Sequence, residues 1–289
     1  MNKILFYVIL LIVFQFVGCN SNRTSLDNNH LGGCILIDPV AEIPSDIYQM
    51  TSIIETNEYE PFNKKLTVCG IILIGRDDIS NDFMQKVGET IKEMFSPNGE
   101  YIDRELQKDL IRNMYKYKTV IPLFKGEDFS FTFSDEKLWD RTTRQNSICD
   151  IIMEGVPGQV TEVVEHILHF VTDIGMHYTF SDDWGISRSS TLYQVMQEAI
   201  DNQYYNVDQY SEIEDHEDRL RVLLQEYAYW LIYTSWDLRE NYGPQEAEWS
   251  IYNSAELNEK LPGSYQLYNN VIPKVMTSPS IETLESFIN

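Results

Sequence analysis

The chain is poor in positive charge. It has 22 Lys and Arg residues against 45 Asp and Glu residues, which gives a formal net charge of −23 at pH 7. A nucleic-acid-binding surface needs clustered Lys and Arg to contact phosphates, and no such cluster occurs. The same acidic excess disfavours docking on anionic lipid. We therefore expect no nucleic-acid partner.

Several catalytic motifs are also missing. The 289 residues contain no glycine-rich phosphate loop and no G-x-S-x-G motif. No motif supports a catalytic dyad of cysteine and histidine. No internal repeat is found. Hydrophobic residues make up 43% of the chain and aromatic residues 12%, so most of it is expected to fold around a core. Only five histidines occur, and three of them fall within residues 162–178.

No apolar run near the N-terminus is long enough to span a bilayer. Lys3 precedes the apolar run Ile4–Val13, and Gly18 then precedes Cys19. This order is typical of a secretory signal peptide, here residues 1–19, because a spanning helix needs about 20 apolar residues. The alternative is an ordinary cleaved signal followed by a chance cysteine.

The ending "FVGC" resembles the lipobox of bacterial lipoproteins, with Phe16 in place of the usual leucine. The resemblance implies that Cys19 becomes the lipid-carrying N-terminus of the mature protein. We therefore expect an exported protein of the bacterial cell envelope, held to the membrane by lipid. Residues 20–33 are polar and predict a flexible tether.

Three further cysteines are present: Cys34, Cys69 and Cys149. An exported protein can pair two of them and leave one over, but the sequence does not show which pair forms. Cys69 lies in an apolar run, which favours a core position.

Residues 34–158 have mixed periodicity. Residues 66–74 predict a buried strand, and residues 81–95 predict a helix whose N-cap candidates are Asp77, Asp78 and Ser80. Further segments predict one more helix (103–117) and two strands (119–124 and 129–133). The first half is therefore expected to form a strand-helix-strand layer.

Residues 159–289 predict a mainly helical half. The first helix is expected to begin near Thr161 and to end near Gly175. Three more helices are predicted, over residues 187–202, 217–236 and 281–289. The fold class is thus α+β, with residues 34–289 expected to form a single domain.

The helix over 161–175 carries pairs of metal-ligand type. Glu165 and His169 are four residues apart, as are Glu162 and His166, and such residues share one face of a helix. The rest of this helix is apolar, and Glu226 lies in an equally apolar helix. Because buried carboxylates are rarely left alone, we expect Glu165, His169 and Glu226 to converge. A metal ion or a buried hydrogen-bond network would satisfy all three.

Residues 66–240 resemble the zincin metallopeptidases, in particular the branch like the catalytic domain of anthrax lethal factor. In that family a helix bears H-E-x-x-H and a later helix supplies a glutamate. Here Glu165 stands at the first ligand position, His166 at the general-base position and His169 at the second ligand position. The resemblance implies Glu226 as third ligand, one divalent metal (zinc first) and a peptide or small-molecule substrate.

The order H-E has become E-H, and two carboxylates with one imidazole acidify a bound water less than the family's own ligands. The chain also resembles uncharacterised exported bacterial proteins with an E-x-x-x-H helix followed by an E-Y-x-Y-W helix, which implies no activity. Alternative ligand sets are His166, His169 and Glu226, or a set that includes His177. Candidate oxyanion stabilisers are Tyr204, Tyr205 and Tyr210.

Three hypotheses about function follow. The first is a divergent metal-dependent hydrolase, which a cleft lined by Glu165, His169 and Glu226 would favour. The second is a non-catalytic zincin-like binding or scaffold lipoprotein, which a filled core at those residues would favour. The third is a carbohydrate- or peptide-binding surface protein, which an exposed aromatic platform would favour; its candidates are Trp139, Trp184, Trp230, Trp236 and Trp249.

Overall fold

The computed structural model describes residues 34–127 and 129–288. The predicted signal peptide (1–19), its lipid-carrying Cys19 and the predicted tether (20–33) lie outside these residues. Among the residues described, no helix combines the length and the apolar character that crossing a membrane requires.

The first half builds a five-stranded mixed sheet in the order β1-β2-β3-β4-β5. The first three strands pair antiparallel, and β3, β4 and β5 pair parallel. The fold class is α+β, as predicted. The strands are β1 (Ile54–Tyr59), β2 (Phe62–Val68), β3 (Ile71–Gly75), β4 (Thr119–Lys125) and β5 (Ile152–Glu154).

The strand predicted over residues 66–74 is wrong in one respect, because the chain folds back in its middle. Cys69 and Gly70 have φ values of 44° and 88°, and they form the two-residue turn between β2 and β3. Two positive φ values suit a tight hairpin, and Gly70 tolerates its value without strain. A continuous apolar run looks the same whether or not it reverses, so hydrophobicity alone does not reveal the turn.

The strand predicted over residues 129–133 is also wrong. Residues 129–132 are irregular, and α3 (Phe133–Gln145) begins at a capping box made by Thr132 and Asp135. Phe131 packs against Phe62 and Trp139, so the aromatic residues of this segment fill a core without joining the sheet.

Most predicted helices are confirmed. Ser80 caps α1 (Asn81–Met94), and Asp103 caps α2 (Arg104–Lys116). The remaining helices, some of them not predicted, are α4 (Gln159–Phe170), α5 (His177–Thr179), α6 (Ser181–Trp184), α7 (Thr191–Asp201), α8 (His216–Ser235), α9 (Leu238–Tyr242), α10 (Ser254–Lys260), α11 (Pro262–Val275) and α12 (Ile281–Glu285).

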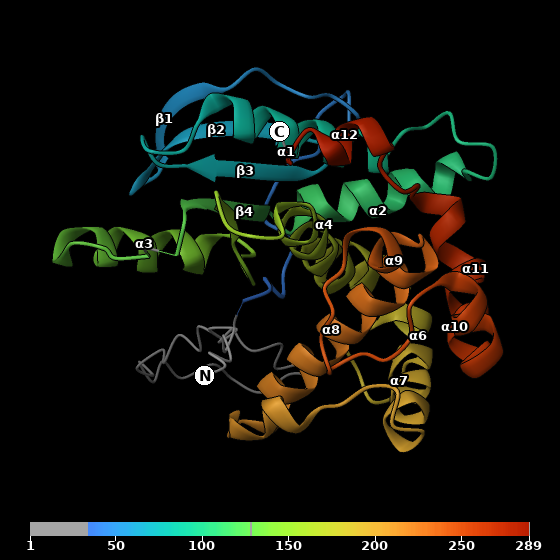
Figure 1. The fold of residues 1–289 in the computed structure, drawn as a ribbon. Helices are drawn as coiled ribbons and strands as arrows, with labels where there is room; N and C mark the ends of the chain where they lie inside the picture. Colours follow the sequence, from blue (N-terminus) through green and yellow to red (C-terminus); the bar gives the residue numbers. More distant parts are fainter. Residues whose placement is uncertain (1–33, 128, 289) are drawn as a thin grey trace.

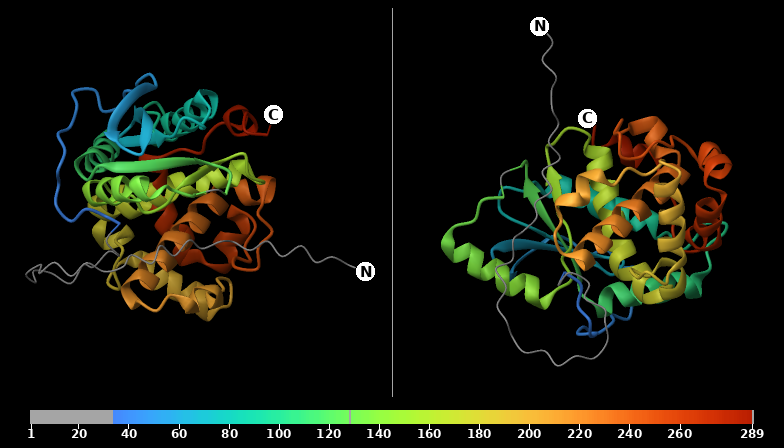
Figure 2. Two further views of the ribbon diagram at one scale, coloured as in Figure 1. Left: turned by 90° about the vertical axis from the view of Figure 1, so that its left-hand side faces the viewer. Right: turned by 90° about the horizontal axis from the view of Figure 1, so that it is seen from below.

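The two faces of the sheet are covered differently. One face contributes to a large core that also includes side chains of α1, α2, α4, α7, α8 and α11. The other face packs mainly on α3, through a smaller core around Phe62 and Trp139. The figures show α3 away from the later helices, which gather on the opposite side (Figures 1 and 2). This arrangement places α4 between the sheet and α8.

The helix that carries the histidines is longer than predicted. It begins at Gln159, and α4 runs directly into a π-helical turn (Val171–Met176) and then into α5. The predicted end at Gly175 is wrong. A Cβ at Gly175 would lie 3.1 Å from side-chain carbons of Leu110 and Met114 on α2, so this glycine allows close helix packing and does not end the helix.

Candidate metal centre

The structure brings together the three predicted ligands. Glu165 and His169 project from α4, and Glu226 projects from the neighbouring α8. One ligand atom from each residue lies within 4.8 Å of the other two. His169 Nε2 is 3.5 Å from Glu226 Oε2. The two helices therefore supply one imidazole and two carboxylates to a single small volume.

Asp150 fixes the orientation of His169. The Nδ1 of His169 donates a hydrogen bond of 2.7 Å to Asp150 Oδ2, because a carboxylate only accepts. The other ring nitrogen, Nε2, then faces Glu165 and Glu226. His169 is 1% exposed, and its Nε2 has no hydrogen-bond partner in the described chain. A carboxylate behind an imidazole is the usual support of a metal-bound histidine.

His166 occupies a different position. Its Nδ1 donates to the backbone carbonyl of Glu162 at 2.6 Å, and its Nε2 lies 3.6 Å from Asp150 Oδ1. Burial alone would lower the pKa of His166, but the carboxylates of Asp150, Glu162 and Glu165 outweigh burial and raise it to about 9. His166 is thus a cation that pairs with Asp150 at neutral pH. Its role as general base stays a prediction.

The charges of the cluster are strongly coupled. Burial would raise the pKa of Asp150, but His166 and His169 lower it to about 2. Burial would lower the pKa of His169, but Glu226 and Asp150 raise it well above its usual range. Burial raises the pKa of Glu165, and Glu226 raises it further against the opposing effect of His166. Without a metal, the cluster therefore balances its carboxylates by holding protons.

Glu162 is engaged by the sheet. Its Oε1 accepts a 2.7 Å hydrogen bond from the backbone N–H of Met153, in β5. Gln159 donates to the carbonyl of Met153 and accepts from the N–H of Gly155, both at 2.7 Å. Side chains of the first turn of α4 therefore provide hydrogen-bond partners for backbone groups at the free edge of β5. Glu162 has a structural role, because it links α4 to β5.

A second layer of polar residues lies behind Asp150. Asp173, on the π-helical turn, is fully buried and forms a 3.1 Å ion pair with Arg221. Arg221 also donates to Gln225 Oε1, and Gln225 Nε2 donates to Asp150 Oδ2 at 3.3 Å. Arg219, two positions before Arg221, donates to backbone carbonyls of residues 211 and 213.

The other candidates lie apart from this group. His177 Nδ1 accepts from the N–H of Ile186 at 3.0 Å, and burial lowers its pKa to about 4. Tyr210 donates to the buried carboxylate of Glu248 at 2.6 Å, and Tyr205 donates to a backbone carbonyl. Burial, with Glu226 next, raises the pKa of Glu248. Among these tyrosines, Tyr210 is therefore hydrogen-bonded to a carboxyl group, that of Glu248, whose pKa depends on the charge of Glu226.

The donor set fits a divalent cation. A buried imidazole nitrogen, which makes no hydrogen bond to the described residues and lies 3.5 Å from Glu226 Oε2, faces two carboxylates. Carboxylate and imidazole both ligate zinc, iron and manganese. Asp150, Gln225 and Glu248 were missed by sequence reasoning. Asp150 precedes His169 by 19 residues and lies on irregular backbone, so no helical spacing points to it.

The cluster is buried at His169 and partly open to solvent at its carboxylates. Two described cavities, of about 340 and 490 Å³, lie elsewhere, and neither includes a residue of the cluster. The side chain of Glu226 is 17% exposed and that of Asp150 is 23% exposed, so solvent reaches the rim of the cluster. Trp139, Trp184, Trp230 and Trp249 are buried and form no exposed aromatic platform.

The chain matches no protein-family model, no curated protein and no solved structure. The assignment of the site therefore depends on its geometry and chemistry.

Proposed function

We propose that the protein is a divergent, peptidase-like metal-dependent hydrolase. In this proposal Glu165, His169 and Glu226 hold one divalent metal ion, and zinc is the first candidate. The observation that carries this proposal is the orientation of His169. Asp150 holds its Nδ1, and its buried Nε2 faces the two carboxylates without a hydrogen-bond partner among the described residues.

The charges support the same ligand set. Two ionised carboxylates and a neutral imidazole carry a charge of −2, which a divalent cation neutralises. Asp150 is already balanced by His166, and Asp173 by Arg221. Leaving two adjacent carboxylates partly buried without a cation is unfavourable, and this explains the protons that the metal-free cluster holds.

The chain's own residues would serve the reaction in distinct ways. When bound, the metal supplies Lewis-acid polarisation and a more acidic water. Asp150 keeps the imidazole of His169 in one tautomer, and Glu165 brings a second carboxylate from the same helix face. His166 has the base position in the zincin-like pattern, and its Nε2 can act only after it loses the proton that makes His166 a cation beside Asp150.

The test is metal content of residues 20–289, measured by elemental analysis after purification without added chelator. We expect about one zinc, iron or manganese per chain in the wild type, and background metal in His169→Ala and in Glu226→Ala. The matched control is His177→Ala, a buried histidine outside the cluster, which should keep its metal. Metal-loaded protein is then assayed for hydrolysis of a mixed peptide library.

Absence of metal from the wild type, with the variants only less stable, would contradict the proposal. The cluster would then be a buried hydrogen-bond network in a non-catalytic envelope lipoprotein. The burial of His169, which is 1% exposed, is the observation that favours this second function.

We also propose export and lipid anchoring through Cys19, supported by the signal-peptide pattern of residues 1–19. Cells expressing the full chain are labelled with a clickable palmitate. Label is expected on the wild type and on Cys69→Ala, which removes the buried free cysteine, and none on Cys19→Ala. Label on the Cys19 variant would contradict the anchor.

A further inference from the structure

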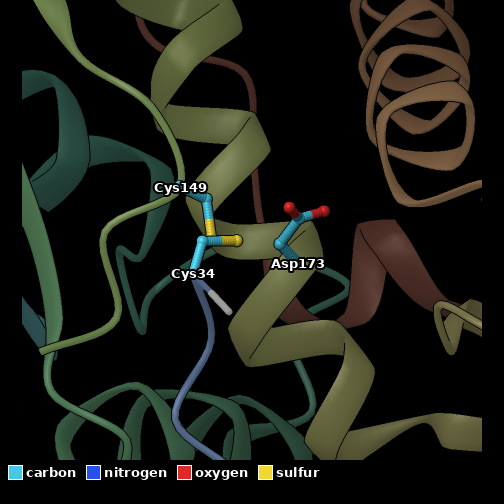
Figure 3. Close-up of side chains that lie close together, drawn as sticks. All are labelled: Cys34, Cys149 and Asp173. Atoms are coloured by element: carbon cyan, nitrogen blue, oxygen red, sulfur yellow. A yellow bond between two sulfur atoms is a disulfide. The ribbon is translucent and has the colours of Figure 1, made fainter. Parts of the chain in front are cut away.

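The disulfide of this protein lies next to the candidate metal centre in the sequence. Cys34 and Cys149 are bonded and lie 115 positions apart in the chain, and Asp150 follows Cys149 directly. Asp150 is the residue that orients His169. Figure 3 shows the two cysteines bridging the start of the described chain and the segment before β5, beside Asp173 on the helix.

The backbone around Asp150 has little regular support. Ser147 makes an isolated bridge to Thr119 of β4, and residues 148–151 belong to no strand. Residues 34–36 make hydrogen bonds to residues 147 and 148. The N–H of Ile148 donates to the carbonyl of Cys34 at 3.0 Å, and the N–H of Leu36 donates to Ser147 Oγ at 2.9 Å.

A polar chain reaches Asp150 from the other side of the disulfide. Atoms of Cys34, Cys149 and Asp173 lie within 4.8 Å of one another, and Asp173 pairs with Arg221. Arg221 occupies Gln225 Oε1, so the amide nitrogen of Gln225 is the atom that faces Asp150. The disulfide, Asp173, Arg221, Gln225 and Asp150 therefore form a closed ring of contacts behind His169.

We propose that the Cys34–Cys149 disulfide is a positioning element of the metal centre, which fixes Asp150 and through it the imidazole of His169. This inference rests on the proposed function, because it assigns a purpose to the disulfide at that same site. Without the bond, residues 148–151 gain backbone freedom, and the 2.7 Å contact between Asp150 and His169 loosens. Loss of such a supporting contact typically weakens metal binding by about 10–100-fold.

The negative charge of Asp173 beside the two sulfur atoms favours the oxidised, bonded state of the disulfide. The carboxylate of Asp173 opposes formation of a thiolate, which is the species that reduction of the bond must release. An oxidising compartment, as expected for an exported protein, would keep the bond formed.

The test compares the affinity for zinc of four proteins by competition with a chromophoric chelator, well below their unfolding temperatures. The wild type is compared with Cys34→Ser/Cys149→Ser and with Asp150→Asn. Leu284→Ala is the matched control, because it also removes a buried side chain but lies on α12, which packs against α1. We expect the disulfide variant to bind about 10–100-fold more weakly, and Leu284→Ala to stay within about twofold of the wild type.

A triple variant separates positioning from general loosening. If the disulfide acts through Asp150, then Cys34→Ser/Cys149→Ser/Asp150→Asn binds no more weakly than Asp150→Asn alone. Wild-type affinity in the disulfide variant, wild-type affinity in Asp150→Asn, or additive losses in the triple variant would each overturn the proposal. If the serine variant does not fold, wild-type protein is used in its place. The folded wild type is reduced with a phosphine, and the phosphine is then removed in the absence of oxygen.

Metal-free protein provides a readout that does not depend on the proposed function. In ¹⁵N-labelled wild type and Leu284→Ala, the Nδ1 proton of His169 should give a slowly exchanging signal, because it is buried against Asp150. The signal should disappear in the disulfide variant, and its persistence there would overturn the positioning role. A wild type that binds no metal but shows this loss would contradict only the metal-centre proposal.

Discussion

Replacing Arg221 by methionine is expected to lower the free energy of unfolding by about 3–5 kcal/mol at pH 7. The substitution leaves Asp173 without its cation, and that residue is fully buried. One of its carboxylate oxygens, Oδ1, already lacks a hydrogen-bond partner in the described chain. An uncompensated buried carboxylate is among the few changes that cost this much. Denaturant unfolding followed by circular dichroism measures the effect.

Two controls support the reading of the Arg221 experiment. Arg188→Met removes an ion pair of 2.7 Å between Arg188 and Glu217, whose side chains are 52% and 44% exposed, and should cost less than about 1 kcal/mol. Arg221→Met/Asp173→Leu removes both buried charges and should recover most of the loss. A cost below about 1 kcal/mol for Arg221→Met would contradict the buried pair.

The Arg221 variant should also respond to pH. Burial raises the pKa of Asp173 to about 6 even beside Arg221, and without the guanidinium this pKa rises further. The folded state then binds a proton that the unfolded state, with its ordinary aspartate, has released. Stability of the variant should therefore rise, relative to wild type, as pH falls from 8 towards 5.

Removing the metal is expected to destabilise the wild type by about 4 kcal/mol when free metal stands a thousandfold above its dissociation constant. The reason is that metal binds the folded chain, in which Glu165, His169 and Glu226 meet. Unfolding is measured with and without a chelator. Glu226→Ala should show no response to the chelator, whereas His177→Ala should respond like the wild type. Identical wild-type curves with and without chelator would contradict the site.

Metal binding should release protons. Glu226 and Asp150 raise the pKa of His169 well above its usual range, so the metal-free imidazole is protonated at neutral pH. A metal must displace that proton to reach Nε2, so affinity should fall as pH falls. Titration with zinc in weak buffer, followed by pH, should show about one proton or more released per metal.

The helices show how far local patterns extend. Ser80 was predicted as an N-cap and caps α1, because a serine before an apolar period of 3.6 is a local signal. The strand predicted over 66–74 instead contains the turn at Cys69 and Gly70, and the strand predicted over 129–133 leads into α3. In these cases packing, and not periodicity, decides where an apolar run goes.

The sequence by itself determined the helix faces and their chemistry. Spacing of four residues put Glu165 and His169 on one face of α4, and the apolar surroundings of Glu226 indicated a buried carboxylate that needs a partner. Only the tertiary structure decided that Asp150 holds His169 and that Cys34 pairs with Cys149. Helical period is a property of adjacent residues, whereas these contacts join irregular segments to distant elements, and only packing of the whole chain brings them together.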